Sequence, residues 1–190
     1  MNTDKQIDAV PTMSRRDRLR RVVILCRNFA RNLAYYRAGQ KAEHLPLLDP
    51  RHPKVNFWRV MNANCIDMCV LEWCKLVGDY KGKHHWSKIV TDPSTFQARL
   101  IIHLSNGEEG VRKEIDVMKE YRDKFLAHLD AEVTMNIPAL GIAKKGVWFY
   151  HAHVVGHEAR PGDLVGLPLE LDTGYAQCET EASAVYEQNA

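Results

Sequence analysis

Apolar residues recur at steps of three and four along most of this chain, and polar residues fill the positions between them. Such spacing gathers the apolar side chains on one side of an α-helix. The pattern therefore predicts an all-α protein, an antiparallel bundle of about five helices. The predicted helices span residues 14–39, 53–78, 93–106 and 108–130, with a fifth that opens at Pro138.

Local signals set the limits of the helices and of the domain. Ser14 is a favourable N-cap residue, and Pro53 suits the first position of a helix. The segment from Glu43 to His52 contains two prolines and is predicted to be a loop. The expected divisions are a disordered N-terminus (1–13), a helical domain (14–160) and a C-terminal tail with room for one helix (161–190).

The second predicted helix is apolar around most of its circumference. Its apolar residues leave no wide polar side; they are Phe57, Trp58, Val60, Met61, Cys65, Ile66, Met68, Cys69, Val70, Leu71, Trp73, Leu76 and Val77. A helix with this pattern is usually buried. We therefore expect it to be central, in contact with several helices or with a partner subunit.

The composition is that of an ordinary globular protein. The 190 residues are 45% hydrophobic and 26% charged, which suits one domain with a core of its own. No apolar run is long enough to span a membrane, and the basic N-terminus lacks a signal-peptide core, so we expect a cytoplasmic protein. The five cysteines include no C-x-x-C pair and are expected to be reduced.

Charge is distributed unevenly although the net charge is only +2. Residues 1–90 contain 17 Lys and Arg against 8 Asp and Glu, whereas residues 91–190 contain 9 against 16. The excess is densest in the first helix, at Arg15, Arg16, Arg18, Arg20, Arg21, Arg27, Arg31 and Arg37. This row can hold phosphates, or it can be a solvated helix face that pairs with the acidic half of the chain.

Most motifs that identify an enzyme are absent, including the phosphate-binding loops, the nucleophile elbow and the zinc-protease signature. His153 and His157 have a spacing that can present two nitrogens to one ion, with His151 nearby, but no residue completes the set, and we expect no metal or other cofactor. His84-His85-Trp86 is either a substrate-facing loop or a packed tryptophan beside two surface histidines.

Arg122 is the residue that departs most from the helical pattern. It lies on the apolar stripe of the fourth predicted helix, between Met118 and Phe125, where a buried unpaired charge would destabilise the fold by several kcal/mol (about 3–5). The guanidinium must therefore be paired or must face a functional cleft. His128, on the flank of this stripe, adds a group that titrates near neutral pH.

An arginine and a histidine supply the chemistry of metal-free RNA cleavage. A base must take the 2′-OH proton, an acid must protonate the departing 5′-oxygen, and positive charge must stabilise the phosphorane. One such pair is sparse, so two copies that meet across a dimer interface would make a better site. The alternative is a structural arginine neutralised by Asp67 or Glu72 of the second helix.

The stretch Tyr121-Arg122-Asp123-Lys124-Phe125-Leu126-Ala127-His128-Leu129-Asp130 resembles the signature of HEPN domains, an arginine followed by a polar residue and by a histidine four to six positions on. The Ala-His-x-Asp ending, the stretch from Asp67 to Asp79 and the following His84-His85-Trp86 resemble the branch of abortive-infection proteins. The resemblance covers roughly residues 20–155.

This resemblance implies a HEPN-like helical bundle that dimerises and cleaves RNA without a metal, in a toxin or antiviral-defence setting. By the same resemblance, Arg122 stabilises the phosphate in the transition state, His128 acts as acid and base, and Asp123 orients one of them or the substrate. Further candidates for contact with RNA are Lys124, Asp130, Arg15 and Arg18. An antitoxin or another defence protein is a possible partner.

Some HEPN domains are not catalytic and serve in RNA binding or in assembly. The alternative function is therefore a non-catalytic RNA-binding or protein-interaction module that binds RNA through the arginine-rich first helix.

Overall fold

A computed structural model describes residues 13–104, 107–127 and 136–189. Throughout these residues the chain is helical or irregular, without a strand, so the prediction of an all-α fold is confirmed. Six α-helices are present here rather than about five: α1 (Arg15–Gly39), α2 (Val55–Trp73), α3 (Pro93–Leu104), α4 (Gly107–Tyr121), α5 (Leu140–His153) and α6 (Leu171–Glu187).

Short segments with other helical geometries join or extend these helices. The 3₁₀ segments are Ala42–Leu48, which overlaps the expected loop, and Trp86–Lys88. Turns of π-helix continue α2, α4 and α5 over Cys74–Gly78, Arg122–Ala127 and Val154–Glu158. Residues 1–12 of the expected disordered N-terminus lie outside the described residues.

The predicted start of the first helix is confirmed. Ser14 is the N-cap of α1, and its Oγ accepts a hydrogen bond from the Asp17 backbone N–H at 3.1 Å. A cap of this kind satisfies one of the free N–H groups of the first turn. Asp92 does the same for α3, where its Oδ1 accepts from the Thr95 backbone N–H at 3.0 Å.

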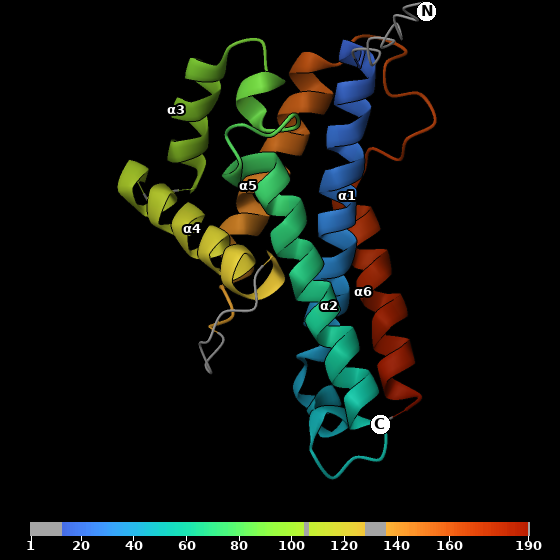
Figure 1. The fold of residues 1–190 in the computed structure, drawn as a ribbon. Coiled ribbons are helices and arrows are strands. Elements are labelled where there is room, and N and C mark those ends of the chain that lie inside the picture. The colour runs from blue at the N-terminus through green and yellow to red at the C-terminus, as the bar shows by residue number, and fades with distance from the viewer. Residues whose placement is uncertain (1–12, 105–106, 128–135, 190) are drawn as a thin grey trace, which may run out of the picture.

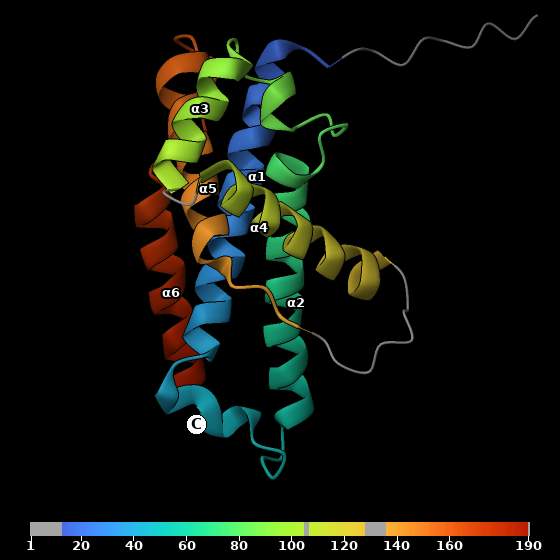
Figure 2. The same ribbon diagram turned by 90° about the vertical axis from the view of Figure 1, so that its left-hand side faces the viewer.

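Helix α1 packs against α2, α5 and α6. Apolar residues at three- and four-residue steps along its inner side are buried: Val23, Cys26, Phe29, Ala30 and Leu33. Figures 1 and 2 show α5 beside the upper half of α1 and α6 beside its lower half, while α2 follows α1 along most of its length. Helix α4 crosses α2 obliquely.

The bundle is not antiparallel throughout, because α6 runs in the same direction as α1. Arg27 at the middle of α1 and Leu171 at the start of α6 line one pocket, and just beyond the end of α1 Lys41 Nζ donates to Ser183 Oγ, near the end of α6, at 2.8 Å. Helix α5 runs opposite to α1. Because the chain reverses direction again between α5 and α6, α6 runs in the direction of α1. The segment expected as a tail thus contributes a helix to the core of the bundle.

A glycine allows α1, α2 and α6 to approach closely near their lower ends. A Cβ on Gly39 would overlap Asn62 Nδ2 of α2 and would lie 2.5 Å from Tyr186 Oη of α6. Asn62 Nδ2 donates to Tyr186 Oη at 3.3 Å, and its Oδ1 accepts from Gln40 Nε2 at 2.7 Å. This polar network fits only because position 39 has no side chain.

The predicted contact of α2 with several helices is found within the described residues, where α2 packs against α1 and touches α4, but these helices do not enclose it. One side of α2 is buried, through residues such as Ile66 and Cys69, but its outer side remains exposed. The exposed apolar residues are Phe57, Val60, Met61 and Met68. Apolarity around a helix therefore did not imply enclosure within this chain, and contact with a partner subunit stays a prediction.

Among the helices described, none combines the length with the apolar character that a membrane span requires.

Candidate functional site

Arg122 lies where α4 ends and a turn of π-helix begins. The preceding turn is fixed in the core by Met118 and Tyr121, which are both buried. The wider π turn shifts the positions that follow it, so the apolar stripe expected from regular helical spacing does not continue unchanged. Arg122 itself, the first residue of this turn, is at the edge of the core, with 19% of its side chain exposed.

Two carboxylates hold the guanidinium of Arg122. Its Nε donates to Asp123 Oδ1 at 2.8 Å, and its Nη1 donates to Asp79 Oδ1. The hydrogen bond with Asp123 raises the pKa of Arg122, and Asp79 adds to this against the opposing effect of burial. The side chains of Asp79 and Asp123 are 35% and 54% exposed, so the group is open to solvent on the carboxylate side.

The carboxylates that the sequence suggested as structural partners of Arg122 bind elsewhere. Asp67 Oδ1 accepts a hydrogen bond from Tyr121 Oη at 2.8 Å, and Glu72 Oε2 forms an ion pair with Lys75 Nζ at 3.2 Å. The prediction that Asp67 or Glu72 neutralises Arg122 is therefore wrong. Asp79 was missed as a partner, although its position directly after the apolar second helix placed a carboxylate at the end of that helix.

The other residues predicted beside Arg122 are only partly described. Lys124 Nζ forms an ion pair with Glu120 Oε1 at 2.9 Å, one turn back along the helix. His128 and Asp130 lie outside the described residues. The structure thus brings Arg122, Asp123 and Asp79 together, and the spatial relation between Arg122 and His128 stays a prediction.

Arg15 and Arg18 lie in a different region, at the start of α1. Arg15 Nη2 forms an ion pair with Glu158 Oε2 at 2.7 Å, and Arg18 Nε donates to the Met13 carbonyl at 3.3 Å. Both line a hollow of about 190 Å³ together with Lys88. Figure 1 shows the start of α1 at one end of the bundle, whereas the end of α4 lies beside the middle of α2.

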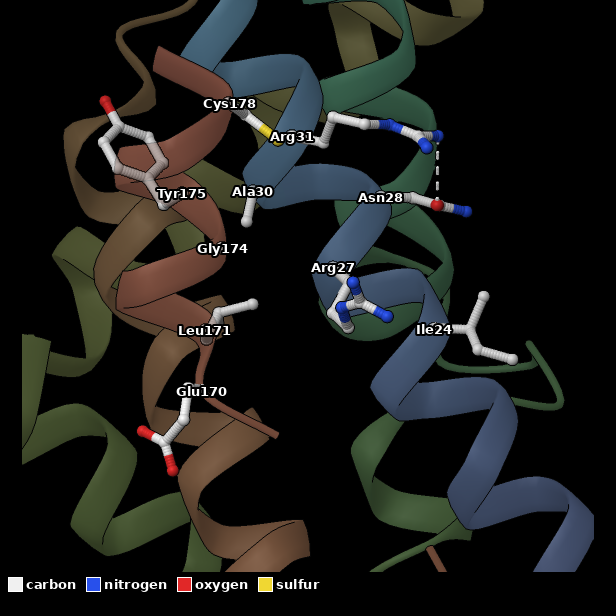
Figure 3. Close-up of a pocket in the computed structure, with 10 residues that line it drawn as sticks. All are labelled: Ile24, Arg27, Asn28, Ala30, Arg31, Glu170, Leu171, Gly174, Tyr175 and Cys178. Atoms are coloured by element: carbon white, nitrogen blue, oxygen red, sulfur yellow. Dashed lines mark hydrogen bonds between the residues drawn. The ribbon is translucent and has the colours of Figure 1, made fainter. Parts of the chain in front are cut away.

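A second pocket, of about 120 Å³, lies between α1 and α6 (Figure 3). Arg27 and Arg31 come from α1, and Arg31 Nη2 donates to Asn28 Oδ1 at 3.3 Å. Leu171 and Tyr175 of α6 form the opposite wall. Glu170, which precedes α6, also lines this pocket, and no ion pair joins it to Arg27 or Arg31.

The histidines near the end of α5 take part in packing and in hydrogen bonds. The rings of His153 and His157 lie 5.1 Å apart, and His153 Nε2 is 3.3 Å from Glu158 Oε1. In the described part of the chain, no group of three or more His, Cys, Asp or Glu side chains has an arrangement that could hold a metal ion.

The segment His84-His85-Trp86 differs from one predicted alternative, a packed tryptophan beside two surface histidines, while the alternative of a substrate-facing loop stays a prediction. His85 is buried rather than exposed, with Nε2 at 2.9 Å from the Val77 carbonyl and Nδ1 at 2.8 Å from Ser87 Oγ. His84 and Trp86 are half-buried. The expectation of two surface histidines is therefore wrong for His85.

The Arg122 group has a defined chemical capacity. A guanidinium fixed at two of its nitrogens presents a permanent positive charge in a set orientation, which is suited to phosphate recognition. Its two carboxylates must give way to an incoming phosphate or must bind groups of the ligand. Comparisons with protein-family models, curated proteins and solved structures found no match to this chain.

Proposed function

We propose that this protein is a metal-independent endoribonuclease of the toxin or antiviral-defence type that acts as a cytoplasmic homodimer. One observation carries the proposal: Arg122 stands at the edge of the core on a π-helical turn, partly exposed and oriented by Asp79 and Asp123. Turns of π-helix occur frequently at functional sites. The resemblance of residues 121–130 to the HEPN signature supports the same function.

Each residue has a distinct role in the proposed reaction. His128 of one protomer takes the proton from the 2′-OH, whose oxygen attacks the phosphorus, and the protonated imidazole then gives a proton to the departing 5′-oxygen. Arg122 of the other protomer stabilises the charge on the phosphorane. Asp123 orients the guanidinium through the 2.8 Å hydrogen bond to Nε. The products are a 2′,3′-cyclic phosphate and a free 5′-OH end.

The test compares the wild-type protein with His128→Ala and Arg122→Lys on single-stranded RNA in the presence of EDTA. We expect the wild type to cleave and both variants to lose at least about 100-fold in rate, because lysine keeps the charge but lacks the bidentate geometry. Cleavage that persists in His128→Ala, or that is absent from the wild type, contradicts the proposal.

Thermal unfolding of Arg122→Ala separates catalysis from structure. The ion pairs of Arg122 are partly exposed, so their loss should destabilise the fold by only about 1 kcal/mol. A much larger loss of stability would explain inactivity without any catalytic role for Arg122.

The second candidate is a non-catalytic RNA-binding or assembly module, to which an antitoxin or another defence protein could bind. It is favoured by the neutralisation of Arg122 within the protomer, where two carboxylates surround one guanidinium. This candidate predicts RNA binding that weakens with salt and does not depend on His128.

A further inference from the structure

The loop between α2 and α3, which spans residues 79–92, is held against the first half of α1 (Figures 1 and 2). Buried contacts fix it at several points. The His85 ring lies within hydrogen-bond distance of the Val77 carbonyl and of Ser87 Oγ, and Tyr150 Oη of α5 donates to the His84 carbonyl at 3.2 Å. The exposed side chains of this loop, such as Lys83 and Lys88, therefore extend into solvent from a backbone that buried contacts hold in place.

Three basic side chains act on His84 through their charge. Burial lowers the pKa of His84, and the positive charges of Arg21, Lys75 and Lys83 lower it further. Arg21 and Lys83 are exposed and form no ion pair with any described residue, while Lys75 pairs with the buried Glu72. The Nδ1 atom of His84 is buried without a hydrogen-bond partner among the described residues.

The same face continues along α1 toward the N-terminus. Arg15, Arg18 and Arg21 follow one another at steps of three, so they spread over about a third of the circumference of the helix along about 9 Å of its length. Lys88 joins Arg15 and Arg18 at the hollow of about 190 Å³. We call these side chains the basic face: Arg15, Arg18, Arg21, Lys75, Lys83, His84 and Lys88.

Carboxylates offset this charge only in part. Glu158 and Glu72 are buried beneath the face, where they bind Arg15 and Lys75. In the same turns of α1, the exposed Asp17 accepts a hydrogen bond from Ser14 Oγ at 2.6 Å. Asp79, at the start of the loop, is bound by Arg122.

An exposed aromatic ring stands in the same loop. Tyr80 is 65% exposed, and Lys88 Nζ lies 4.7 Å from the centre of its ring. Cationic grooves that carry exposed aromatic rings bind single-stranded nucleic acids, because the cations hold phosphates and the rings stack on bases. A membrane surface would instead be matched by a basic helix with a wide apolar side next to the charges.

We propose that the basic face binds the backbone of single-stranded RNA, with phosphates on the exposed Arg21 and Lys83 and with one base stacked on Tyr80. This inference rests on the proposed function, because it takes RNA to be the ligand, and it adds a binding surface outside the Arg122 site. The face leads toward that site through Asp79, which begins the loop and is the partner of Arg122.

The test measures binding of a fluorescein-labelled 2′-O-methyl oligouridine, which has no 2′-OH and cannot be cleaved. We expect Arg21→Glu and Lys83→Glu each to raise Kd at least tenfold at low salt. Lys83→Ala should make the slope of log K against log salt shallower by about one. The matched control is Lys145→Glu, an exposed lysine on α5, which should bind like the wild type.

Stacking is tested separately at Tyr80. Tyr80→Ala should weaken binding by about tenfold or more, and Tyr80→Phe, which keeps the ring, should bind like the wild type. Equal weakening by both variants overturns the stacking role.

Other outcomes also decide the question. The basic face is overturned if Arg21→Glu and Lys83→Glu bind the oligonucleotide with the same affinity as Lys145→Glu. It is also overturned if the protein binds phosphatidylserine vesicles but does not bind the oligonucleotide. If these variants lose binding and the wild type does not cleave RNA, the basic face stands and the nuclease proposal is overturned. If the wild type cleaves RNA and these variants bind it as well as the wild type does, the nuclease proposal stands and the basic face is overturned.

Discussion

His151 is a buried histidine, 5% exposed, near Arg27 of α1 and Asp172 of α6. Burial lowers its pKa to about 4, with a further contribution from the charge of Arg27. Its Nε2 has no hydrogen-bond partner among the described residues, so a proton added there would be solvated poorly. The ring is thus held neutral by its surroundings, and protonation is coupled to unfolding.

The pH dependence follows from the difference in pKa between the two states. Between about pH 6.5 and pH 4 the unfolded chain binds the proton and the folded chain does not, so stability falls as the pH falls, by up to about 1.4 kcal/mol per pH unit. Urea unfolding of the wild type and of His151→Gln at several pH values should show that the variant lacks this contribution. His103→Gln, at an exposed position, is the control, and an identical pH dependence in both variants contradicts the prediction.

At the scale of elements, Glu158 joins three segments that are far apart in the sequence. Its side chain is buried in the π turn after α5, and it accepts hydrogen bonds from Arg15 of α1 at 2.7 Å and from the backbone N–H and Oγ1 of Thr91 at 2.7 Å each. Burial alone would raise the pKa of Glu158, but the hydrogen bonds from Thr91 and His153 prevail and lower it. This carboxylate therefore helps to position the basic face.

We expect Glu158→Gln to destabilise the protein by about 2 kcal/mol, because hydrogen bonds to a charged group are lost while Arg15 keeps access to water. Thr91→Val removes only the hydroxyl and should have about half that effect. Urea unfolding measures both, with Glu187→Gln at the exposed end of α6 as the control. A change as small in Glu158→Gln as in the control would show that the carboxylate does not stabilise the fold.

At the scale of the whole molecule, the proposed nuclease takes its arginine and its histidine from two protomers. Arg122→Ala and His128→Ala should then be inactive alone and should recover activity when they are mixed under conditions that exchange protomers. Half of the dimers would be mixed, and each would hold one complete site, so about a quarter of the wild-type activity is expected.

Light scattering must show dimers in each preparation, of about twice the chain mass of 21.8 kDa. Mixed dimers that form and remain inactive would contradict a site shared in this way between protomers.

Local signals in the sequence determined the helices and the inner side of α1. Ser14 as N-cap and the three- and four-residue spacing of Cys26, Phe29 and Leu33 act within one or two turns, so their effect can be predicted without knowledge of the rest of the chain. The position of Arg122 on an apolar stripe was visible for the same reason.

The tertiary structure alone decided which segments meet. Asp79 and Arg122 are 43 positions apart, and Arg15 and Glu158 are 143 apart, so each pairing depends on how whole helices cross. The parallel course of α6 along α1 and the exposed side of α2 have the same origin. Periodicity defines which side of a helix is apolar, but only the packing of the other helices determines whether that side is covered.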